Sequence, residues 1–164
     1  MLLGGRVGQN GTTKMTKFNP VYTVRKATLS DVMFFYESIN TTIGLALNEI
    51  EFDELFKLKL KTKSNQLLVL IDQEGVSAGC AIIELRTVLT ETYPFCEIQL
   101  FYIQPKYRKH FAAEALYQEL EKASAMKNCF KIIVSSLIDA TINQRFYTRK
   151  GFKFVKKTYF KTVS

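Results

Sequence analysis

A cluster of basic residues stands between a predicted strand and a predicted helix, and its chemistry would be the binding of an anion. Lys106, Arg108, Lys109 and His110 follow Pro105 and precede a helix predicted from position 112. The first backbone N–H groups of a helix have no partner within it, and the helix dipole favours negative charge at that end. The cluster therefore predicts an anion site, although a solvated basic turn would have the same composition.

The two elements that must position this cluster have clear patterns. Residues Glu97–Ile103 form a run rich in β-branched and aromatic residues that Pro105 ends, which predicts a strand. In the segment that follows, small and apolar residues recur at spacings of four, four and three, which predicts an amphipathic helix that runs to Met126. These residues are Ala112, Leu116, Leu120 and Ala123.

The N-terminal half predicts a strand and two helices. The strand covers Val21–Ala27, and the first helix should be capped by Ser30, carry Asp31 in its first turn and end near Asn40. After a loop, residues Glu49–Lys61 predict a second helix. Its buried side should hold Phe52, Leu55, Leu58 and Leu60, and its solvated side three lysines.

Two further strands follow as a hairpin. Residues Gln66–Asp72 are almost all apolar, which predicts a strand covered on both faces. A turn that ends at Gly75 leads to its partner, Val76–Leu85. Gly79 lies inside this second strand, where glycine lowers strand propensity and therefore needs a packing reason.

The C-terminal part predicts a strand at Lys131–Ser135, a short helix at Ile142–Lys150 that Gly151 ends, and a last strand at Phe152–Lys161. The whole order is β-α-α-β-β-β-α-β-α-β, which indicates a mixed α/β (α+β) layer structure. Residues 19–164 should form one domain, and the glycine-containing residues 1–18 should be a flexible lead-in.

Composition narrows the class of protein. The chain has 164 residues, 47% of them apolar and 23% charged, as in a folded globular domain. A net charge of +8 indicates an anionic partner, and the absence of a block of like charges argues against a nucleic-acid-binding tail. No apolar run reaches the roughly 18 residues that span a bilayer.

The cysteines and the single histidine argue against disulfide bonds and against a metal site. The three cysteines, Cys80, Cys96 and Cys129, lie in apolar surroundings without metal-ligand spacing, which favours buried, reduced thiols in a cytoplasmic protein. A single histidine argues against a histidine-based metal site.

Two stretches resemble the GNAT superfamily of N-acetyltransferases. The run Arg108-Lys109-His110-Phe111-Ala112-Ala113 resembles the family's acetyl-CoA loop, Arg/Gln-x-x-Gly-x-Gly/Ala, and is preceded by Pro105 and Tyr107. The run Phe146-Tyr147-Thr148-Arg149-Lys150-Gly151-Phe152 resembles the family's Phe-Tyr-x-x-x-Gly-Phe. Both stretches stand on the expected elements in the expected order, and the resemblance covers roughly residues 21–162.

The resemblance implies a fold and a cofactor. It implies a mixed central sheet that splays between its fourth and fifth strands, with helices on both faces. Acetyl-CoA would place its pyrophosphate on the N–H groups from Lys109 to Ala113, with Arg108 and His110 adding charge. The N–H near Phe101 would meet the thioester carbonyl, and Ile103 would pair with the pantetheine arm. The implied cofactor-binding set is Phe101, Tyr102, Ile103, Arg108, Lys109, His110, Phe111, Ala112, Ala113, Asn143 and Tyr147.

The resemblance also implies two catalytic residues. Tyr147 matches the general acid that protonates the leaving thiolate, and a neutral phenol can donate that proton at pH 7. Glu97 matches the general base of some family members, acting directly or through water. A glutamate paired with Lys or Arg in the strand is an equally good interpretation of Glu97, and a core tyrosine is the alternative for Tyr147.

The chain departs from the family pattern at two positions. Phe111 replaces a common glycine, so that either its ring points into the core, which we favour, or the cofactor is displaced. Ala140 replaces an asparagine that stands seven residues before the tyrosine, and Asn143 lies nearer. These departures motivate the alternative of an acyl-CoA-binding or protein-interaction module without turnover.

The acceptor is left open by the sequence. The expectation is a primary amine of a small molecule or peptide, and the family often forms dimers, so a homodimer is compatible with the resemblance. Four acidic residues open the second helix and would suit a cationic amine, although acidic residues there also complement the helix dipole. They are Glu49, Glu51, Asp53 and Glu54.

Overall fold

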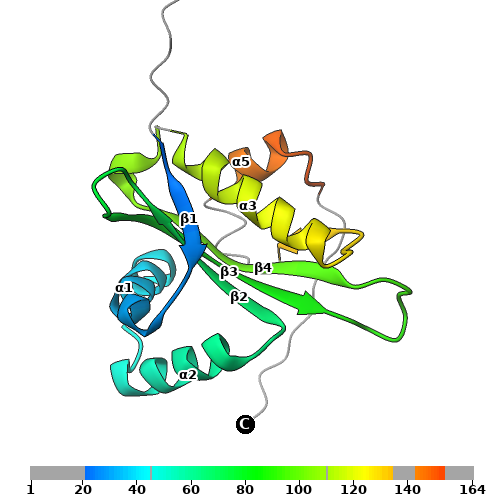
Figure 1. Ribbon diagram of the computed structural model, residues 1–164, viewed down its shortest axis with the longest axis horizontal. Coiled ribbons are helices and arrows are strands. Elements are labelled where there is room, and N and C mark those ends of the chain that lie inside the picture. Colours follow the sequence, from blue (N-terminus) through cyan, green and yellow to red (C-terminus); the bar gives the residue numbers. More distant parts are fainter. Residues whose placement is uncertain (1–20, 45, 110, 135–142, 154–164) are drawn as a thin grey trace, which may run out of the picture.

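The computed structural model describes residues 21–44, 46–109, 111–134 and 143–153, and these form a five-stranded sheet with helices on both faces (Figure 1). The strands are β1 (Thr23–Lys26), β2 (Asn65–Ile71), β3 (Ser77–Arg86), β4 (Phe95–Ile103) and β5 (Ile132–Val134). The helices are α1 (Val32–Ile43), α2 (Glu49–Lys61), α3 (Ala112–Met126) and α5 (Gln144–Arg149), with 3-10 turns at Leu29–Asp31 and Pro105–Tyr107. The strand expected at Phe152–Lys161 lies almost entirely outside the described residues.

The sheet order confirms the mixed architecture. Strands β1 to β4 are antiparallel neighbours in chain order, and β5 lies parallel to β4 at the end of the sheet. Helices α1 and α2 cover one face, and α3 and α5 cover the other (Figure 1). None of the described helices is long and apolar enough to cross a membrane.

Strand β2 shows why both faces need cover. Leu68 and Leu70 pack in the cluster beneath α3, whereas Leu67 and Val69 pack against Phe35 of α1 and the residues around it. Alternate side chains of a strand point to opposite faces, so an almost wholly apolar strand must be buried twice. This confirms the expectation of a strand covered on both faces.

Helix α2 is rotated relative to the prediction. Phe56 is its buried residue and packs against Phe35 with ring centroids 5.2 Å apart, whereas Leu55 and Leu58 are 51% and 60% exposed. The buried stripe follows Phe52, Phe56 and Leu60 at a spacing of four. The prediction that Leu55 and Leu58 face the core is wrong, because the larger aromatic ring of Phe56 takes the place between the helices.

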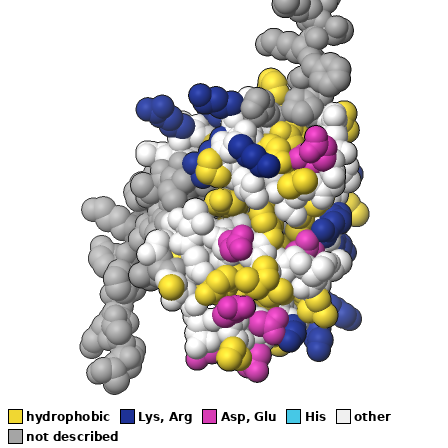
Figure 2. Space-filling model, turned by 90° about the vertical axis from the view of Figure 1, so that its left-hand side faces the viewer, with side chains coloured by type: hydrophobic (Ala, Val, Ile, Leu, Met, Phe, Trp, Pro, Cys, Tyr) yellow, Lys and Arg dark blue, Asp and Glu magenta, His cyan; other side chains and the backbone are white. Residues whose placement is uncertain are grey.

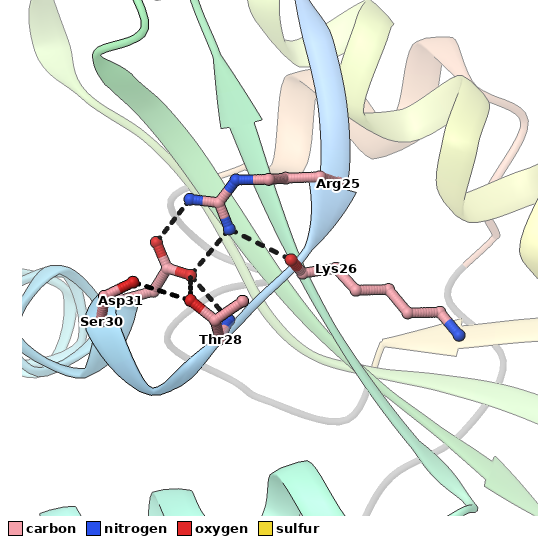
Figure 3. Close-up of polar contacts among 5 residues, drawn as sticks. All are labelled: Arg25, Lys26, Thr28, Ser30 and Asp31. Carbon is pink, nitrogen blue, oxygen red and sulfur yellow. Dashed lines mark hydrogen bonds and ion pairs between the residues drawn. The ribbon is translucent and has the colours of Figure 1, made fainter.

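Arg25, Thr28 and Asp31 join β1 to α1 (Figure 3). The Arg25 guanidinium donates to both carboxylate oxygens of Asp31, each at 2.8 Å, and the Thr28 N–H donates to the same carboxylate at 2.7 Å. Thr28, and not Ser30, therefore stands at the start of the first turn, because the carboxylate that bonds back lies three residues after Thr28.

We expect Asp31→Asn to destabilise the fold by about 1–3 kcal/mol at neutral pH, because the variant weakens a charge-assisted pair whose acceptor is buried. The hydrogen bond from Arg25 holds the pKa of Asp31 below its ordinary value. The stabilisation is therefore present above the ordinary aspartate pKa and is lost as the pH falls through the lowered one. Urea unfolding of both proteins at pH 7 and pH 3 measures this effect, and an equal difference at the two pH values would contradict it.

Candidate active site

A cavity of about 180 Å³ opens at the end of β4, beside the basic cluster. Its described walls come from four elements or their flanking residues. Helix α1 and strand β4 contribute Thr41, Thr42, Phe101, Tyr102 and Ile103. The start of α3 and the region of α5 contribute Arg108, Ala113, Asn143, Phe146 and Arg149. Two arginines and no described carboxylate line it, so its charge suits an anionic group.

The cavity lies beside the part of β4 that follows its described pairing with β5. That pairing runs from Cys96 to Ile98, opposite Ile132 to Val134, and residues 135–142 lie outside the described residues. Within the described residues the rest of β4 pairs with β3. The register between β3 and β4 shifts so that Gln99 is the extra residue of a bulge. A bulge bends its strand and interrupts the ladder, so β4 changes direction just before the cavity.

Beyond Ile98, the edge of β4 that has no described strand partner presents backbone groups to the cavity. Asn143 Nδ2 donates to the Phe101 carbonyl at 3.0 Å, and Arg108 Nε donates to the Ile103 carbonyl at 3.0 Å. The N–H and C=O of one strand residue point to the same edge, so the N–H groups of Phe101 and Ile103 face this edge as well. On the other edge, the Gln104 N–H donates to Ala78.

Close packing holds β3 against this part of β4. A Cβ on Gly79 would lie 2.6 Å from the carbonyl oxygen of Tyr102, closer than any side chain allows. The expected packing reason for Gly79 is therefore confirmed, and it concerns the strand that forms the cavity wall.

The basic cluster forms the loop that leads into α3. The Ala115 N–H makes the first helical bond, to Phe111, so the N–H groups just before it lack a partner inside the helix. Tyr107 fixes the loop to the β2–β3 turn because its hydroxyl donates to Asp72 at 2.5 Å. This hydrogen bond is the main reason that the pKa of Asp72 is lowered. His110 lies outside the described residues.

Phe111 has the backbone of a glycine. Its φ of 61° and ψ of 7° are left-handed, and its side chain is 53% exposed. The prediction that its ring fills the core is wrong, because a residue in this conformation directly before α3 turns its side chain outward. The bare backbone that glycine would give is replaced by an exposed ring at the helix start.

We expect Phe111→Gly to stabilise the protein by about 0.5–1 kcal/mol. A left-handed conformation costs an L-residue about 1–2 kcal/mol, and the greater freedom of glycine in the unfolded chain offsets part of that gain. Urea unfolding measures the difference. Phe111→Ala is the matched control, because it removes the ring and keeps the strain. An equal gain in the alanine variant would assign the effect to the ring.

Helix α5 places Tyr147 behind the cavity wall. Phe146 lines the cavity, whereas Tyr147 is buried and packs against Phe101 and Phe152 with centroids 6.2 and 5.2 Å apart. Consecutive residues of a helix point about 100° apart, which explains why only one of the two faces the cavity. Ala140, the other departure from the pattern, lies outside the described residues.

Glu97 lies away from the cavity. It is buried, stands opposite Glu84 on β3, and forms an ion pair with Arg86. Its Oε2 atom accepts no hydrogen bond from the described residues. Because Glu84 also approaches Lys59 of α2 at 3.8 Å, these acidic residues face α2. Five residues of extended strand, roughly 16 Å, separate Glu97 from Tyr102 at the cavity.

Sequence reasoning gave no site role to two residues of the cavity wall, Phe146 and Arg149. It placed Thr41 and Thr42 in the stretch Asn40–Asn48, which was expected to meet the acceptor, and both line the cavity. The two threonines were assigned to a loop, but α1 continues to Ile43 and ends at Gly44, whose φ is 67°. A glycine four residues beyond the predicted helix end was the signal that could have extended α1.

Comparisons with known proteins agree with this architecture. The family model described as the acetyltransferase (GNAT) family matches residues 32–152. A search among curated protein sequences gave no match.

Solved structures of similar fold share little sequence with the chain. A protein of Bacillus halodurans, described as a transcriptional regulator, is 18% identical with a TM-score of 0.75, and the match covers 87% of this chain and 100% of that one. The aminoglycoside N-acetyltransferase AAC(6')-Iy, solved with CoA, is 14% identical with a TM-score of 0.74, covering 88% and 95%.

A second aminoglycoside 6'-N-acetyltransferase, AAC(6')-Ih of Acinetobacter baumannii, is 16% identical with a TM-score of 0.73, and the match covers 88% of this chain and 99% of that one. At these identities the neighbours show the fold alone. The family model spans the second helix, strands β2 to β5 and both signature stretches, and the chain therefore belongs to the GNAT acetyltransferase family.

Proposed function

We propose that the protein is an N-acetyltransferase that moves the acetyl group of acetyl-CoA directly to a primary amine of a small molecule or peptide. The observation that carries this proposal is the edge of β4 at Phe101 and Ile103, where the described residues include no strand partner and the N–H groups face a cavity that ends at a basic helix start. Such an edge can accept an extended polar chain, and such a helix start can hold a phosphate.

Each part of the site has a task in this reaction. Acetyl-CoA supplies the activated acetyl group. The N–H groups between Lys109 and Ala113 and the guanidinium of Arg108 would hold its pyrophosphate, and Ile103 would pair with its pantetheine arm. The Phe101 N–H would donate to the thioester carbonyl oxygen, where negative charge develops as the amine attacks.

Proton transfer completes the reaction. The amine nitrogen forms a bond to the carbonyl carbon, the carbon–sulfur bond breaks, and Tyr147 would give the thiolate its proton. Glu97 is too far from Tyr102 to take the amine proton directly, so that in this scheme it could act only through a chain of water molecules. Tyr147 is not among the described walls of the cavity either, but it packs directly against the wall residue Phe101, so it is the better supported of the two catalytic assignments.

Structural neighbours supply support of a coarser kind. Two of them are aminoglycoside N-acetyltransferases, and one of these was solved with CoA. An amine acceptor and a CoA donor for this chain are in line with those relatives, and the identity of its acceptor is not carried over from them.

Two measurements on the full chain test the proposal. Calorimetry with CoA should give one site per protein, and mass spectrometry after incubation with acetyl-CoA and a panel of primary amines should detect an acetylated product. CoA binding with no transfer to any amine would favour the alternative, a CoA-binding module. The absence of CoA binding would overturn both.

A further inference from the structure

The cavity is lined by side chains from both faces of β4, so its two ends have different surroundings. Phe101 and Ile103 belong to the core cluster under α3 and α5, whereas Tyr102 packs in the cluster beside α1 and α2. The arginines of the cavity wall come from the α3 and α5 side, and the threonines come from α1. If CoA occupies the first side, the acceptor must approach from the side of Tyr102 and Thr41.

Glu37 stands at this second end. It lies on α1 four residues before Thr41, which places both on one side of the helix about one turn apart. Glu37 is exposed, and within the described residues no Lys or Arg lies at ion-pair distance from it. A carboxylate that lies one helical turn from the wall residue Thr41 and has no such partner is available to a cation from outside.

The electrostatics of Tyr102 connect Glu37 with the cavity. Burial raises the pKa of the Tyr102 phenol, the charge of Arg108 lowers it, and smaller contributions from Cys80 and then Glu37 raise it. The charge of Glu37 on α1 therefore acts weakly on a side chain that lines the cavity.

The acidic start of α2 does not compete for this role. Glu49 and Glu51 occupy the first turn of a helix capped by Asn48, and Asp53 forms an ion pair with Lys57. Like Glu37, none of these residues is among the described walls of the cavity, but Glu37 lies one helical turn from the wall residue Thr41 on the same helix, and these residues lie on α2. Figure 2 shows the side of the molecule that includes α1 and α2, with acidic side chains at the upper right, in the middle and near the bottom, and lysine and arginine at the top and along the right edge.

We propose that Glu37 is the anionic subsite of the acceptor, and that the enzyme prefers a diamine whose second, charged ammonium group binds Glu37 while its neutral amine enters the cavity beside Tyr102 and Thr41. This inference rests on the proposed function and adds a substrate class to it. Glu37 would act as a specificity-determining residue that touches the part of the acceptor that does not react.

Matched amines test the preference. The probes are 1,4-diaminobutane against n-butylamine and 1,6-diaminohexane against n-hexylamine, with acetyl-CoA as donor. Wild-type protein should show a kcat/KM about tenfold higher for the better diamine than for its monoamine. Glu37→Gln should abolish this preference through KM, with kcat and the monoamine unaffected, and Glu37→Asp should restore part of it.

Glu54→Gln is the control for charge alone. Glu54 is exposed on α2 and does not line the cavity, so its loss should leave the preference unchanged. An equal loss in Glu54→Gln and Glu37→Gln would mean that overall charge sets the preference, and the subsite would be wrong. Equal rates for diamine and monoamine in wild-type protein would also overturn it.

A binding readout separates this inference from the proposed function. Calorimetric titration of the CoA-bound protein with each amine needs no turnover. If no amine is acetylated but the diamine binds more tightly than the monoamine and Glu37→Gln removes the difference, the transfer reaction fails and the subsite stands. If the diamine binds no more tightly than the monoamine, the subsite fails, whether or not acetylation is observed.

Discussion

Replacing Arg108 with Glu should weaken the binding of CoA by about a hundredfold or more. Arg108 lines the cavity, and its Nε is already committed to the Ile103 carbonyl, which leaves the two terminal nitrogens of the guanidinium for a phosphate. The substitution removes charge-assisted hydrogen bonds and places a carboxylate beside the pyrophosphate, so that lost attraction and new repulsion add. Calorimetry with CoA measures the change in dissociation constant.

Two controls keep the Arg108 result interpretable. Arg145→Glu makes the same change of charge at an exposed position of α5 that does not line the cavity, and it should leave the dissociation constant within about threefold. Arg108→Gln keeps much of the side chain and should show an intermediate loss. If Arg145→Glu and Arg108→Glu weaken CoA equally, the effect is long-range and the phosphate assignment of Arg108 is wrong.

The elements around the site could be predicted from local patterns. The bounds of α2 and the start of α3 follow from the spacing of their apolar residues, and Gly79 inside a predicted strand indicated that its position needs a packing reason. These features depend on residues close in sequence, so a local sequence pattern is enough to predict them.

Features that depend on residues far apart in sequence could not be predicted from local patterns. The bulge at Gln99 decides which side chains of β4 share a face, and it is visible only when β4 is paired with β3. The outward ring of Phe111 follows from a backbone conformation that an L-residue rarely adopts, so a phenylalanine there predicts the opposite. The ion pair of Glu97 with Arg86 likewise joins two strands.

Tyr147→Phe should lower kcat about a hundredfold and leave the affinity for CoA unchanged. The variant keeps the ring that packs against Phe101 and removes the hydroxyl that would protonate the leaving thiolate, a step worth 10²–10⁴-fold in enzymes that use it. Single-turnover and steady-state rates with the best amine acceptor of the panel measure the loss, and calorimetry checks that CoA still binds.

Tyr117→Phe is the matched control, because Tyr117 is buried in the same aromatic cluster and lies outside the described cavity wall. Its variant should retain kcat, and a similar loss in both would show that packing of the cluster limits the rate. Tyr102→Phe tests whether Tyr102, the tyrosine that lines the cavity, is the general acid instead. A large loss of kcat in Tyr102→Phe with none in Tyr147→Phe would identify Tyr102 as the general acid. The thiolate would then form on the side of the strand where Glu37 and Thr41 lie.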